Sequence, residues 1–213
     1  MDIIKDNNLK VSFVGISLGG LSTTESAAAV IDENSNIILL DKLFSMNDVK
    51  YFIENFAGKQ NSVFAVSVPD NEVMISSKWK YNSRTYDVVN FDVKMKNIDG
   101  WTNRFSPRGS EYFKELSAKG IDIFRYDTKN MKQIYGNCSS FQDRTPIDCK
   151  ALQDTLRIKY DMRELPVNML PVAQLEAILG AVLAKMVVFP DSEFECKIIG
   201  EFENLPVVGI WNF

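Results

Sequence analysis

Hydrophobic and polar positions along the first seventy residues predict three short strands, a helix and a fourth strand. The three strands, each followed by a polar or glycine-containing turn, are expected at 11–16, 26–31 and 37–44. Asn47 is suited to cap a helix over 48–57, where apolar side chains recur on one face. The apolar run 62–68, stopped by Pro69, is typical of a strand buried on both faces. We therefore expect a β-β-β-α-β start, with three antiparallel strands and a fourth parallel to the first.

The rest of the chain alternates between regular and irregular stretches. Periodic apolar residues predict helices at 110–119, 145–160 and 172–188, and strands at 121–126 and 203–211. The stretch 78–108 mixes charges and aromatic residues without a sustained period. The sequence thus predicts one α/β domain over 1–213, a mixed sheet flanked by helices, with an irregular insertion at 78–108.

Composition excludes several classes of protein. The chain has 213 residues, 46% of them apolar, and a net charge of −4, which rules out wholesale disorder and a purely electrostatic coat for nucleic acid. It contains no histidine, so an imidazole triad or a histidine zinc site is impossible. Cys138, Cys149 and Cys196 form no C-x-x-C pair, which favours free thiols. With no apolar signal core and no run of about 20 apolar residues, we expect a cytoplasmic protein without a membrane partner.

Five segments in order carry a resemblance to a known family. They are the GISLGG motif at 15–20, the AVSVP motif at 65–69, and the stretches 144–150, 174–179 and 200–208. Together they resemble a bacterial ribonuclease-H-like family of predicted nucleases whose biological role is unknown. The resemblance implies carboxylates at the ends of adjacent strands that hold Mg²⁺ or Mn²⁺ for phosphodiester cleavage.

The chain departs from that pattern at two expected metal ligands. The first-strand and fourth-strand positions are Ser17 and Ser67, and a neutral hydroxyl is a poor Mg²⁺ ligand. Glu176 stands at the late-helix position, and Asp70 follows Ser67 by three residues. Ser17, Ser67, Asp70 and Glu176 are therefore the candidate catalytic residues of a degenerate site, and we expect Ser17, Ser67 and Glu176 in one cleft at the strand ends.

Structural roles for the same residues stay open. The two serines are also suited to capping main-chain groups, and Glu176 to the positive end of a helix dipole. Asp70 also fits a turn after Pro69. A displaced single-metal site built from Asp70 and Glu176 is the remaining possibility.

The insertion 78–108 is the candidate nucleic-acid-binding segment. It contains seven basic, three acidic and six aromatic residues, so it carries +4 and leaves −8 on the rest of a chain whose total is −4. Basic side chains neutralise phosphates, and aromatic rings stack on exposed bases. The candidate contacts are Lys78, Trp79, Lys80 and Arg84. Alternatively, the aromatic rings belong to the core and the charges to a solvated face.

Three functions fit these observations. The first is a ribonuclease-H-like nuclease homologue with impaired or absent activity that binds nucleic acid. The second is a phosphotransferase or ATPase of the sugar-kinase and actin superfamily, in which main-chain N–H groups near Gly19 and Gly20 cradle a phosphate. The third is a binding module without catalysis. Whether the protein is an enzyme stays open at this point.

Overall fold

The computed structural model describes residues 11–18, 26–57, 61–68, 107–135, 145–202 and 204–212. The first elements follow the predicted order: β1 (Val11–Ser17), β2 (Ser26–Ile31), β3 (Ile37–Leu43), α1 (Met46–Ala57) and β4 (Asn61–Ser67). Strand β2 pairs antiparallel with both β1 and β3, and β4 pairs parallel with β1. This arrangement confirms the predicted β-β-β-α-β start and its strand directions.

The second part of the chain extends the sheet and adds four helices within the described residues. Its elements are α4 (Pro107–Ala118), β5 (Asp122–Tyr126), α5 (Thr128–Tyr135), α6 (Pro146–Lys159), α7 (Val172–Val188), β6 (Phe194–Phe202) and β7 (Leu205–Asn212). The strand order in the sheet is β3-β2-β1-β4-β5-β7-β6. Strands β4, β5 and β7 run parallel, whereas β6 is antiparallel to β7. The result is a seven-stranded mixed sheet flanked by helices, as predicted.

Two elements differ from the sequence prediction. Helix α5 was not predicted, because its eight residues, TKNMKQIY, contain few apolar positions. The tail was predicted as a single strand at 203–211 but is the hairpin of β6 and β7, which turns at Asn204 with a φ of 62°. Charged residues and Gly200 interrupt the apolar alternation of β6, so its sequence pattern is weak.

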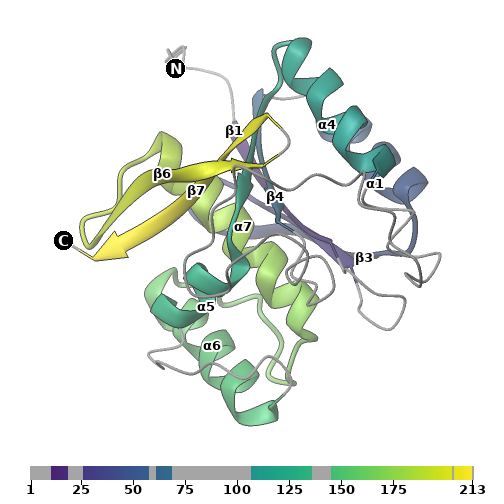
Figure 1. Cartoon of the computed structure of the whole chain (residues 1–213). Coiled ribbons are helices and arrows are strands. Elements are labelled where there is room, and N and C mark those ends of the chain that lie inside the picture. Colours follow the sequence, from purple (N-terminus) through teal and green to yellow (C-terminus); the bar gives the residue numbers. More distant parts are fainter. Residues whose placement is uncertain are drawn as a thin grey trace.

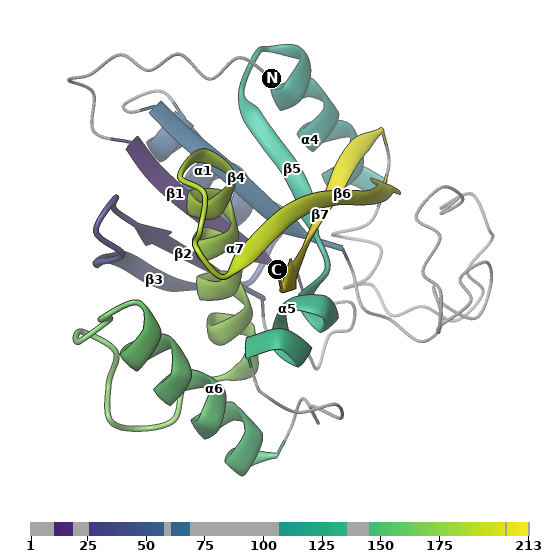
Figure 2. The same ribbon diagram turned by 90° about the vertical axis from the view of Figure 1, so that its left-hand side faces the viewer.

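Helices cover both faces of the sheet (Figure 1, Figure 2). Successive side chains of a strand point to opposite faces, so Phe13 packs with the residues of α5, α6 and α7, whereas Val14 packs with those of α1 and α4. None of the described helices combines the length and the apolarity needed to cross a bilayer.

Helix α7 lies unusually close to the sheet, because two glycines remove side chains at the contact. A Cβ at Gly15 of β1 would lie 1.9 Å from the carbonyl oxygen of Ala177 and 2.3 Å from the amide nitrogen of Ala181. On the helix side, a Cβ at Gly180 would lie 2.8 Å from the ring of Tyr126 in β5. The close approach sets the position of the first turns of α7 relative to the ends of β1 and β5.

We predict that Gly15→Ala destabilises the fold by about 3 kcal/mol or more, because the added methyl group meets rigid main-chain atoms. Gly209→Ala is the matched control: its Cβ would approach side-chain atoms of Asn130 and Trp211 no closer than 3.0 Å. That variant should lose about 1 kcal/mol. Urea denaturation of both variants measures the difference, and equal losses would contradict the close contact between α7 and β1.

Candidate functional site at the strand ends

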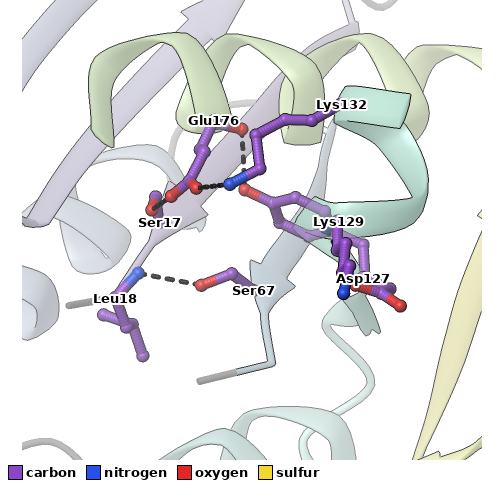
Figure 3. Close-up of polar contacts among 8 residues, drawn as sticks. Ser17, Leu18, Ser67, Asp127, Lys129, Lys132 and Glu176 are labelled. Carbon is purple, nitrogen blue, oxygen red and sulfur yellow. Dashed lines mark hydrogen bonds and ion pairs between the residues drawn. The ribbon is translucent and has the colours of Figure 1, made fainter. Parts of the chain in front are cut away.

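The candidate site lies where β1 and β4 end. These strands are parallel neighbours, so Ser17 and Ser67, the last residue of each, lie at the same edge of the sheet. Both serines are buried. Helix α7 brings Glu176 to this edge (Figure 3). The expected proximity of these three residues is therefore confirmed.

The carboxylate of Glu176 is the centre of the polar contacts. The Ser17 hydroxyl donates a hydrogen bond to Glu176 Oε2 over 2.6 Å. The other carboxylate oxygen, Oε1, accepts from Lys132 Nζ at 2.7 Å and forms an ion pair with it (Figure 3). Both carboxylate oxygens are thus engaged within the protein.

This ion pair is largely removed from solvent. The side chain of Lys132, which comes from α5, is 2% exposed, and that of Glu176 is 16% exposed. A buried charge is costly unless it is paired and hydrogen-bonded. Each of these two groups therefore offsets the cost of burying the charge of the other.

Tyr126 fixes the main chain beside the same glutamate. Its hydroxyl donates to the carbonyl oxygen of Glu176 over 2.7 Å. Burial, and to a smaller extent the charge of Glu176, raise the pKa of Tyr126 well above its ordinary value. The phenol is therefore a neutral hydrogen-bond donor at any physiological pH, and it ties the end of β5 to α7.

Ser67 makes a structural contact at the end of the neighbouring strand. Its hydroxyl oxygen accepts a hydrogen bond from the N–H of Leu18 over 2.8 Å, just after β1 ends. The carbonyl oxygen of Ser67 accepts a hydrogen bond from Arg125 Nη1 at 3.3 Å. The guanidinium carbon of Arg125 lies 4.7 Å from the centre of the Phe113 ring. Capping of a main-chain group, one of the two roles considered for Ser67, is thus observed.

The structure adds residues that sequence reasoning missed. Lys132 went unnoticed because α5 was not predicted, and Tyr126 was assigned only to a strand. Asp127 directly follows β5, is buried, and accepts the N–H of Lys129 at 2.9 Å at the start of α5 (Figure 3). Their place in the sequence could have indicated them, because they end or follow β5, a strand that runs parallel to β4.

The described residues do not fit a divalent metal ion. Mg²⁺ and Mn²⁺ require several hard oxygen ligands, with carboxylates to balance the charge. Here the serine hydroxyls are neutral, and the carboxylate of Glu176 is already paired with an ammonium group. Among the residues that the structure describes, no group of three or more histidine, cysteine, aspartate or glutamate side chains could hold a metal.

Several predicted site residues lie outside the described residues. Asp70 is one of them, and so are all four candidate nucleic-acid contacts: Lys78, Trp79, Lys80 and Arg84. Their roles stay predictions from the sequence.

Comparisons with known proteins give one distant structural similarity. No family model matches the chain, and no curated protein matches it. Among solved structures, it is similar to T. thermophilus RuvC in complex with a Holliday junction substrate. The two share 14% identity over 84% of this chain and 97% of that chain, with a TM-score of 0.44.

We predict that Lys132→Met destabilises the protein by about 3 kcal/mol, because it leaves the Glu176 carboxylate buried without its cation. Glu176→Gln should also be destabilising, because it leaves a buried ammonium group. The double variant Lys132→Met with Glu176→Gln should lose clearly less than the sum of the two single variants. Urea denaturation of the four proteins measures this coupling, and losses that simply add would contradict the pairing.

Proposed function

We propose that this protein is a ribonuclease-H-like nuclease homologue that binds nucleic acid but does not cleave it by a metal-dependent mechanism. The observation that carries the proposal is the ion pair between Lys132 and Glu176 at the ends of the parallel strands. There, the resemblance implied a divalent cation held by several carboxylates. Glu176 is the carboxylate that contacts Ser17, and a protein ammonium group neutralises it. Asp127, the other carboxylate described at this edge, accepts the N–H of Lys129.

The exchange of a metal for a lysine has a chemical consequence. A metal pair positions a phosphodiester, activates water and stabilises the leaving oxygen. The ammonium of Lys132 supplies one positive charge, which its contact with Glu176 balances, and it is shielded from solvent. It thus preserves the local charge balance and the fold without offering an open coordination position to a substrate.

Binding to nucleic acid is proposed from the composition of the segment 78–108. It carries +4 in a chain of net −4, and its aromatic residues alternate with basic ones around Lys78, Trp79 and Lys80. Phosphate neutralisation and base stacking together suit a single strand and require no metal. The segment follows β4 in the chain, and β4 ends with Ser67 at the candidate site.

The alternative phosphotransferase function has less support. Gly19 and Gly20, the proposed phosphate cradle, lie outside the described residues. The first-strand carboxylate that such enzymes also use is replaced by Ser17, which is buried and bonded to Glu176. No described contact specifically favours nucleotide binding.

We predict that millimolar Mg²⁺ or Mn²⁺ neither raises the melting temperature nor produces cleavage of DNA or RNA. A ligand stabilises the fold by RT ln(1 + [L]/Kd), which is negligible when Kd far exceeds its concentration. Thermal melts and gel assays with labelled oligonucleotides measure both effects. Stabilisation of the wild-type protein by micromolar Mn²⁺, or cutting in its presence, would contradict the proposal.

Restoring carboxylates gives the complementary test of the metal site. Ser17→Asp with Ser67→Asp should gain some Mn²⁺ binding. Adding Lys132→Gln should increase that gain, because the competing ammonium is then removed. The control is Ser17→Asn with Ser67→Asn and Lys132→Gln, which is similar in size but adds no carboxylates and should gain nothing.

For nucleic acid, we predict weak, salt-sensitive binding of single strands. The triple variant Lys78→Ala, Lys80→Ala and Arg84→Ala should weaken it and flatten log K against log salt by roughly 0.7 for each phosphate that is no longer neutralised. Fluorescence anisotropy with labelled DNA and RNA at low and moderate salt measures both quantities. The control, matched in charge, replaces Lys150, Arg157 and Lys159 of α6 with alanine. No binding at low salt, or an equal loss in the control, would contradict the role of this segment.

A further inference from the structure

A cavity of about 600 Å³ lies away from the candidate site. Its walls come from the beginning of β5, the end of α7 and the β6–β7 hairpin. Glu176 stands near the beginning of α7, whereas Met186 lines the cavity near its end. Ten residues of helix span about 15 Å, so the cavity and the candidate site are separate places.

The cavity forms because the sheet opens between β5 and β7. These strands pair at only two positions, Arg125 with Val207 and Tyr126 with Val208. Pro206, one residue earlier, has no N–H with which to continue the ladder toward the beginning of β5. Figure 2 shows β6 and β7 set at a steep angle to β5. The diverging strands leave a slot in place of a continuous sheet.

The lining of this slot combines apolar walls with negative charge. Phe124, Met186, Phe194 and Val208 contribute apolar surface. Asp122, Asp191, Glu195 and Lys197 are the charged residues of the lining, and the lysine is paired with Glu195 at 2.7 Å. Asp191 accepts the N–H of Glu193 at 2.7 Å, and its negative charge interacts with the charge of Lys185. Among the described residues, Asp122 forms no ion pair within 4 Å, so Asp122 is the carboxylate most available to a ligand.

Cys196 also lies among these carboxylates, and its pKa is affected by them. Its thiol lines the slot, and burial, with additional contributions from Asp191 and Glu195, raises its pKa to about 11. The thiol is protonated at neutral pH, so the slot offers no reactive thiolate. Its chemistry suits reversible, non-covalent binding.

We propose that this slot binds a small apolar molecule that carries a cationic amino group. Its volume lies within the range of sites for small organic ligands. The apolar walls cover the body of such a ligand, and the carboxylates of Asp122 and Asp191 attract its ammonium group. The same carboxylates repel phosphates, so the slot is not a continuation of the proposed nucleic-acid interface.

Dansylcadaverine, a fluorescent apolar amine, is a direct probe, and neutral dansylamide is its matched control. The full chain should bind dansylcadaverine saturably and at least tenfold more tightly than dansylamide. Asp122→Asn should reduce that preference severalfold, whereas Asp41→Asn on β3, at the opposite edge of the sheet from β6, should leave it unchanged. Fluorescence titration at low salt measures the affinities of the three proteins for both probes.

A blocking variant tests the location independently of charge. Cys196→Phe places a ring in the slot and should abolish binding of both probes, with a thermal melt to show that the variant is folded. If it does not fold, Asp122→Lys replaces it and should abolish the preference for the amine. Absence of saturable binding, equal affinity for the two probes, or binding unaffected by the variant would overturn the proposal. Saturation with single-stranded DNA should not displace dansylcadaverine, which separates this site from the proposed function.

Discussion

The ion pair between Lys132 and Glu176 is the interaction on which the described end of the sheet depends. It joins α5 to α7, and the hydroxyl of Ser17 links the same carboxylate to the end of β1. Glycines at the contact between α7 and the sheet allow this geometry, because a side chain at Gly15 would push the helix away. The close contact of α7 with the sheet therefore places Glu176 where it can bond Ser17 and Lys132.

Under the proposed function, this interaction lets the strand ends keep their fold without a metal ion. Carboxylates gathered at the strand ends repel each other unless a cation balances them. Ser17 and Ser67 are neutral, and the ammonium of Lys132 balances the charge of Glu176. The serine hydroxyls then satisfy neighbouring polar groups: Ser17 donates to Glu176, and Ser67 accepts from Leu18.

The elements that the sequence predicted well are those whose pattern is local. The β-β-β-α-β start and helix α7 follow from apolar periodicity, turn residues and run length. The proximity of Ser17, Ser67 and Glu176 could be expected because parallel neighbours end at one edge. Lys132 could not be found in this way, because its helix is mostly polar and its partner lies 44 residues further along the chain. The slot beside β5 likewise depends on where β7 stops pairing, which no local pattern reveals.

The two ends of the fold differ in charge and in chemistry. At the ends of β1 and β4, Lys132 and Glu176 form a largely buried ion pair, whereas the slot near the beginning of β5 is lined by the carboxylates of Asp122 and Asp191. At the first end, we propose that the ammonium of Lys132 takes the place that a metal ion has in the resembled family. Anomalous diffraction from crystals soaked in Mn²⁺ tests it most directly. We predict that no manganese peak appears beside Glu176 and that Lys132 Nζ stays within hydrogen-bond distance of Oε1. A manganese peak coordinated by Glu176, with Lys132 displaced, would contradict it.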